Sequence, residues 1–223
     1  MNKKLREQLT SIARERQTKD DPSHDFDHVL RVLHMAIKIT KKEKADIDIV
    51  VAAALFHDTV VYRKDLPESH NETDESAEVV GQIFREIRGF PVEKIPAIQT
   101  CIRECSFSKG IMPETIEGKV VQDADRLESA GAISIMRTYS SGGHMGRPLY
   151  STEDPLRQNG LPYTLSPLQS STDLFFKRLL LVGDTMRTET GKKMAVRRAK
   201  FLRTFLNELE KELKESGVIK SKK

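Results

Sequence analysis

Hydrophobic positions recur every three or four residues along most of the chain, which is the spacing of one face of an α-helix. No stretch of any length alternates apolar and polar residues as a β-strand does,. The pattern therefore predicts an all-α fold, with Ser23 as a cap of the second helix and a break near Gly131. The predicted helices span residues 2–17, 24–43, 46–58, 71–88, 92–106 and 115–139. Helical spacing resumes near residue 172, and a last helix is predicted from about 190 to 215.

The helical pattern stops over residues 140–168, which contain Ser-Ser-Gly-Gly, four prolines and few apolar residues. A loop of this length in a compact domain is typically either functional or mobile. It could close over a substrate and supply Arg147 to a phosphate group, or it could simply be disordered. We predict a single helical domain over residues 1–215 that carries this insertion, followed by a basic, frayed tail at 216–223.

Composition narrows the class of protein. The longest unbroken apolar run covers residues 49–56, which is far too short to span a membrane,. Two cysteines cannot form a disulfide scaffold, so we expect a cytoplasmic location,. The net charge of +4 is uneven: residues 191–223 carry +7, which leaves −3 for the rest of the chain. Such a run of basic residues at a helix end is usually a solvated surface and not a binding site, so we expect no nucleic-acid partner. Because no apolar run is long enough to span a bilayer, we also expect no membrane partner.

His57 and Asp58 end the most apolar helix of the chain. A buried histidine and a buried carboxylate need partners, because unpaired polar groups are costly in an apolar environment. One metal ion would satisfy both, or His57 could bond a backbone carbonyl while Asp58 caps a loop. His28 lies on the preceding helix, and Arg31 shares its face three residues later,.

Two further carboxylates, Asp123 and Asp125, lie within the apolar stretch 120–128. Residues two apart on a helix point about 200° away from each other. Only one of the two can therefore face a site shared with the histidines, and helical geometry alone leaves the choice open.

In order and spacing, His28, His57-Asp58 and Asp125 resemble the H…HD…D signature of the HD-domain superfamily of metal-dependent phosphohydrolases. The chain is most similar to the small single-domain bacterial and archaeal members. The resemblance implies an HD-type helical bundle in which His28, His57, Asp58 and Asp125 bind metal. Asp123 then either supports the metal ligands from behind or has a purely structural role. Relatives tend to carry histidines where this chain has Cys105 and Leu174.

Members that bind two metals carry additional histidines between the His-Asp pair and the last aspartate. Here residues 59–124 contain only His70, so the resemblance implies one divalent ion. A donor set of two imidazoles and two carboxylates is intermediate in hardness. Mn(II), Fe(II), Co(II), Ni(II), Mg(II) and Zn(II) all remain possible.

The resemblance implies hydrolysis of a nucleotide or another small phosphate ester, as a monoesterase or a diesterase, with Asp58 in the catalytic centre. Glu72 and Glu75 are candidates for general acid or base, although acidic residues are also common in the first turn of a helix. Candidate phosphate-binding residues are Arg31, Arg126 and Arg147. The alternative is a metal-containing module that binds or senses a ligand without efficient turnover.

Overall fold

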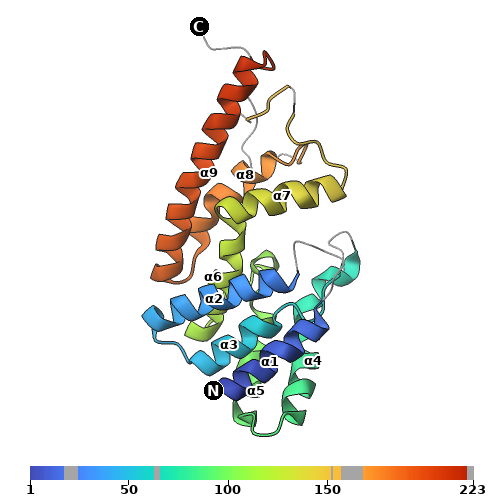
Figure 1. Ribbon diagram of the computed structural model, residues 1–223, viewed down its shortest axis with the longest axis vertical. Helices are drawn as coiled ribbons and strands as arrows, with labels where there is room; N and C mark the ends of the chain where they lie inside the picture. Colours follow the sequence, from blue (N-terminus) through green and yellow to red (C-terminus); the bar gives the residue numbers. More distant parts are fainter. Residues whose placement is uncertain (18–24, 63–65, 152, 157–167, 220–223) are drawn as a thin grey trace. The chain divides into compact units, whose positions relative to one another are not determined.

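The structure is a computed structural model that describes residues 1–17, 25–62, 66–151, 153–156 and 168–219 (Figure 1). In these ranges all regular elements are helical, which confirms the prediction of an all-α fold. The chain forms two compact units, the first of Met1–Arg126 with Arg187–Gly191 and the second of Leu127–Met186 with Lys192–Lys223. The single domain expected over residues 1–215 stays a prediction. Among the described helices, none is both long enough and apolar enough to cross a bilayer.

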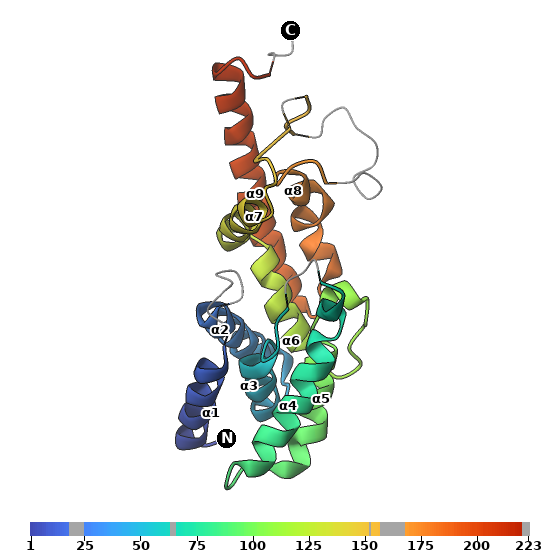
Figure 2. The ribbon, with the colours of Figure 1, turned by 90° about the vertical axis from the view of Figure 1, so that its right-hand side faces the viewer.

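The first unit is built around one short, buried helix. All residues of α3 from Val50 to Phe56 are buried, and α3 contacts α1, α2, α5 and α6. Figure 2 shows α4 and α5 side by side in this unit, and Phe84 of α4 meets Phe56 edge to face. The helices are α1 (Lys3–Arg16), α2 (Phe26–Glu43), α3 (Ile47–Phe56), α4 (Glu72–Glu86), α5 (Ile95–Arg103) and α6 (Ile116–Arg126), with short 3₁₀ turns at Pro67–His70, Val92–Lys94 and Phe107–Lys109.

Aspartate caps determine where α2 and α3 begin. Asp25 accepts a hydrogen bond from the backbone N–H of His28 at 2.8 Å, so His28 lies in the first turn of α2. Asp46 accepts hydrogen bonds from two backbone N–H groups of α3. Such side chains satisfy N–H groups that have no partner inside the helix. The predicted cap Ser23 lies outside the described residues.

The second unit has a core of aliphatic and aromatic side chains. Phe175 of α8 stacks on Phe205 of α9 with ring centroids 5.5 Å apart, and Tyr139 of α7 lies against both rings. Leu202 and Leu206 of α9 belong to the same cluster. The unit contains the 3₁₀ turn Leu127–Ser129, α7 (Ala132–His144), α8 (Asp173–Lys177), the 3₁₀ segment Leu179–Thr185, and α9 (Glu189–Glu215) from Lys192 onward.

One predicted boundary is confirmed and another is corrected. The helix predicted over 115–139 is two helices, and the break lies near Gly131 as predicted, where φ is +82°. The second of them continues through His144, so residues 140–144 are helical and the loop predicted at 140–168 begins only afterwards. Tertiary packing explains this, because Gly142 lies against Ser171 where a Cβ would come within 2.1 Å of Oγ. Within that loop, residues 152 and 157–167 lie outside the described residues, as do residues 220–223 of the predicted tail.

Candidate metal centre

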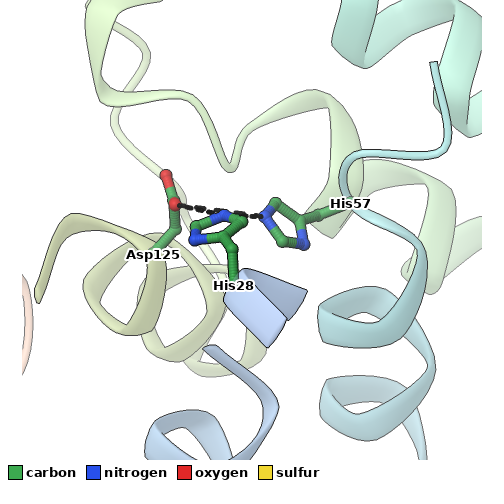
Figure 3. A group of neighbouring side chains, drawn as sticks. All are labelled: His28, His57 and Asp125. Atoms are coloured by element: carbon green, nitrogen blue, oxygen red, sulfur yellow. Dashed lines mark hydrogen bonds and ion pairs between the residues drawn. The ribbon is translucent and has the colours of Figure 1, made fainter. Parts of the chain in front are cut away.

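Two buried imidazoles of the first unit face each other at the centre of the candidate site (Figure 3). His28 comes from the first turn of α2, and His57 immediately follows the last residue of α3. Their Nε2 atoms are 3.3 Å apart. The side chain of His28 is 0% exposed and that of His57 is 1% exposed, so bulk water does not reach either ring.

Two carboxylates complete the group. Asp58 Oδ2 lies 3.4 Å from Nε2 of both histidines. Asp125 Oδ1, from the last turn of α6, lies 3.6 Å from Nε2 of His28 and 3.9 Å from that of His57. The aspartate side chains are 21% and 30% exposed. The imidazoles therefore form the dry side of the site, and the carboxylates form the side that water and ligands can reach.

The hydrogen bond of His57 determines which ring nitrogen faces the centre as an acceptor. Its Nδ1 lies 2.9 Å from the backbone oxygen of Ala54. A carbonyl oxygen can only accept, so Nδ1 carries the proton and Nε2 of the neutral ring presents its lone pair. Histidine ligands in metal sites are commonly oriented in this way. His28, His57 and Asp125 offer ligand atoms that all lie within 4.8 Å of one another, and this mixed nitrogen and oxygen set fits a divalent ion.

Asp123 points away from this group. Its carboxylate is buried and accepts hydrogen bonds from the backbone N–H groups of Arg187 and Thr188, both at 2.8 Å, and from the Thr188 hydroxyl at 2.7 Å. Burial raises the pKa of Asp123 more than these hydrogen bonds lower it. Gly191 allows the close approach, because a Cβ there would come within 2.4 Å of Oδ2. The two carboxylates thus lie on different sides of α6: Asp125 lies beside the histidines, and Asp123 bonds Arg187 and Thr188.

Glu72 and Glu75 both bind the segment that follows Asp58. Glu72 Oε1 accepts a hydrogen bond from the backbone N–H of Tyr62 at 2.7 Å. Glu75 Oε2 accepts one from the Tyr62 hydroxyl at 2.6 Å, and this bond is the main reason why the pKa of Tyr62 is raised. The structure therefore shows the two glutamates as supports of the chain that leaves the site. Their role as acid or base stays a prediction.

The three candidate arginines occupy different places. Arg31 is half-buried on α2, one turn after His28. Arg126 directly follows Asp125, is 5% exposed, and lies over the Phe107 ring at 4.0 Å. Arg147 belongs to the second unit, where its backbone N–H donates to Gly142 O at 2.8 Å. Contact of Arg147 with substrate stays a prediction.

The two positions at which relatives tend to carry histidine also differ from each other. Cys105 is buried in the first unit, and burial raises the pKa of its thiol well above the usual value. The negative charges of Asp125 and Asp58 raise it further, so a neutral thiol lies near the centre. Leu174 lies half-buried on α8 in the second unit.

Gln122 is a residue that the sequence reasoning missed. It is 1% exposed, and its Nε2 donates to the backbone oxygens of Glu104 at 2.8 Å and Ile111 at 3.0 Å. These two bonds hold the segment of residues 104–111, called the 104–111 loop below, against α6. The available signal was a glutamine in an apolar helical stretch, since a buried amide must find partners.

Comparisons with known proteins agree with this geometry. A family model described as HD domain matches residues 25–130, a range that contains all four candidate ligands. The uncharacterized protein YpgQ of Bacillus subtilis (strain 168) is 34% identical over 216 residues, which cover 94% of each chain. The chain belongs to the HD-domain superfamily.

Solved structures of similar proteins extend the likeness over nearly the whole chain. Bacillus subtilis YpgQ in complex with ADP is 30% identical with a TM-score of 0.68, and the match covers 93% of this chain and 97% of that one. A Bacillus thuringiensis protein named an HD-superfamily hydrolase is 29% identical with a TM-score of 0.67, with coverage of 94% and 96%. The HD-domain resemblance found in the sequence is thereby confirmed.

Proposed function

We propose that the protein is a metal-dependent phosphohydrolase that acts on a nucleotide or another small phosphate ester. The observation that carries the proposal is the convergence of two buried histidine Nε2 atoms with the carboxylates of Asp58 and Asp125. Two comparisons support it: one similar protein has been crystallised with ADP, and another is named a hydrolase.

The geometry suits a site with one open side. A divalent ion bound there would polarise a phosphoryl oxygen and lower the pKa of a water molecule. His28 and His57 hold their positions because both rings are buried and the Nδ1–H of His57 is bonded to Ala54 O. Asp58 and Asp125 are partly exposed, so a phosphate ester approaches from their side.

Residues near the ligands supply the remaining functions in this proposal. Arg31 and Arg126 follow His28 and Asp125 on their helices and contribute positive charge toward a bound phosphate,. Glu72 and Glu75 transfer a proton to or from the reacting groups. Because both glutamates hold Tyr62 in this structure, the proposal requires one of these bonds to open when substrate binds.

Metal content and turnover should be measured together on purified wild-type protein and on Asp58→Ala. We expect one equivalent of a divalent ion by elemental analysis and metal-dependent hydrolysis across a panel of nucleotides and generic phosphate esters. Asp58→Ala should lose both, with turnover reduced on the order of 100-fold or more, since the variant removes one of the four proposed metal ligands. Asp27→Ala removes an exposed carboxylate one residue from His28 and is the matched control.

The outcome distinguishes the two candidate functions. An Asp58→Ala protein that still binds one equivalent of metal with wild-type affinity would contradict the ligand assignment. Wild-type protein that binds metal and nucleotide but hydrolyses nothing in the panel would instead support the alternative of a ligand-binding or sensor module.

A further inference from the structure

The last helix of the second unit carries a strongly basic outer face. Between Thr190 and Asn207 the chain has six lysines and arginines and no aspartate or glutamate, and five of these cations are exposed. At 3.6 residues per turn, the five lie within about 140° of the circumference of α9 and along about 17 Å of its length. We call them the basic face of α9: Lys192, Lys193, Arg197, Lys200 and Arg203.

The opposite side of α9 is buried in the core of the second unit. Leu202 is fully buried and Leu206 is 6% exposed, and both belong to the cluster that contains Phe175 of α8. Figure 1 shows α7 and α8 on one side of α9 within this unit. Insertion of a helix into a membrane surface needs a free apolar side. The apolar side of α9 is covered by its own unit, so only the basic face is free to bind.

The basic face differs from the last two turns of the same helix in its charge pairing. There Lys211 pairs with Glu208 and Lys214 with Glu210, each at 2.8 Å. In the ranges that the structure describes, no carboxylate pairs with a side chain of the basic face. Like charges three or four residues apart on a helix repel each other, and neighbouring cations of the basic face have this spacing. An anion bound along the face would relieve this repulsion.

An exposed aromatic ring lies at one edge of the basic face. Phe201 is 49% exposed, and it follows Lys200 directly and Arg197 by four residues. Phe205, one turn further on, instead stacks on Phe175 in the core. Phe201 contacts no other ring of the described residues. An exposed ring beside several cations is the combination with which proteins bind single-stranded nucleic acid, because each nucleotide offers a base for stacking and a phosphate for pairing.

Single-stranded nucleic acid fits this surface better than other polyanions. In a duplex the bases are already stacked on one another, so Phe201 would have no partner there. An acidic peptide satisfies the cations and leaves the ring in water. From the sequence alone, the basic run is expected to be solvated and without a nucleic-acid partner. The exposed ring and the cations without carboxylate partners revise that expectation.

We propose that the basic face of α9, together with Phe201, binds single-stranded nucleic acid. The cations contact successive phosphates, and the Phe201 ring stacks on one base. No covalent bond forms or breaks. The basic face belongs to the second unit, whereas the candidate metal ligands belong to the first. Binding of the strand is therefore a property separate from the proposed hydrolysis, and each can fail without the other.

Fluorescence anisotropy with a labelled oligothymidine of about 12 nucleotides tests the contacts to phosphate. The logarithm of the association constant should fall with the logarithm of salt concentration with a slope of about −3.5, if all five cations contact phosphates. Lys193→Gln combined with Arg197→Gln should change this slope to about −2. Lys41→Gln combined with Lys42→Gln removes the same charge from exposed positions of the first unit and should leave the slope unchanged.

Phe201→Ala tests the stacking separately. The variant should bind the oligothymidine on the order of tenfold more weakly with the same salt slope, because it removes stacking and no charge. Val196→Ala removes another exposed apolar side chain of α9 and is the matched control, with unchanged affinity. A duplex of the same length should bind the wild type more weakly and be insensitive to Phe201→Ala. If Phe201→Ala does not fold, Phe201→Leu replaces it, since leucine is apolar but has no ring.

Several results would overturn the inference. They are no binding at about 50 mM salt, unchanged affinity in Phe201→Ala, and an unchanged salt slope in the Lys193 and Arg197 double variant. Equal affinity for the duplex, for polyglutamate of similar charge, or for vesicles that contain phosphatidylserine would also overturn it. So would a dimer that Phe201→Ala converts to monomers, because a second copy of the chain would then cover the basic face.

Discussion

Two buried carboxylates, one in each unit of this protein, find their backbone partners in different ways. In the second unit, Asp173 accepts hydrogen bonds from the backbone N–H groups of Gln169 and Ser170, at most four residues away. In the first unit, Asp123 is satisfied by Arg187 and Thr188, which lie 64 and 65 residues further along the chain. A hydrogen bond from a residue nearby in the sequence stabilises only a local turn. A hydrogen bond from a distant residue holds two separate segments of the chain together.

The first unit uses long-range polar contacts of this kind around the candidate metal centre. His28 meets His57 across 29 residues, and Gln122 joins the 104–111 loop to α6. In the described part of the chain, the group of side chains arranged to hold a metal lies in this unit. The second unit instead has an aromatic and aliphatic core. In the first unit, polar contacts between distant segments therefore lie close to the candidate metal centre.

The largest expected effect on stability separates the two units. Leu202→Ala removes a fully buried side chain from the core of the second unit and should cost about 2–5 kcal/mol of the free energy of unfolding. Urea denaturation followed by circular dichroism measures this. The manganese content of the folded variant should equal that of the wild type, and a parallel loss of metal would show that the contrast between the units is wrong.

A smaller effect tests the distant partner of Asp123. Thr188→Val keeps the shape of the side chain but removes the hydroxyl that donates to Asp123 Oδ2 and accepts from the Gly191 N–H. Leaving buried polar groups without partners should cost about 1–3 kcal/mol. Thr204→Val, whose exposed hydroxyl bonds only its own helix, is the control and should change stability by less than about 0.5 kcal/mol. Equal stability of the two variants would contradict the role of the distant contact.

The smallest effect concerns the partly exposed ion pairs of Lys94 with Asp46 and Asp48. Burial alone would raise the pKa of Asp46 and Asp48, but hydrogen bonds from Lys94 contribute to a net lowering of both below 3.8. A carboxylate whose pKa is lowered by folding stabilises the folded state above its unfolded pKa, and this contribution disappears as the pH falls. Lys94→Met should therefore cost about 1 kcal/mol or less near neutral pH.

The pH dependence provides the measurement for this pair. The difference in unfolding free energy between wild type and Lys94→Met should be constant from pH 7 to about pH 5 and shrink below about pH 4. Lys38→Met, an exposed lysine on α2, should show no such pH dependence. A difference that grows toward acid would contradict the assigned direction of the pKa shifts.

Much of the fold was predictable because local rules determine it. Apolar spacing located the helices within a few residues, and the continuous apolar run of α3 correctly marked it as buried. The helical segment predicted over residues 115–139 continues further than expected, to His144. The predicted end was wrong because a glycine such as Gly142 usually indicates a turn. In the structure it allows close contact with Ser171, and no local pattern contains that information.

The sequence by itself determined the class of the fold, the order of the helices and the four residues that match the HD signature. These depend on residue type and on spacing along the chain. Only the tertiary structure decided that Asp123 bonds Thr188, that the Gln122 amide joins the 104–111 loop to α6, and that Arg187 Nε bonds Gln122. The physical reason is that a buried polar group must be satisfied by whichever segment packs against it, and the packing of distant segments is not written in local periodicity.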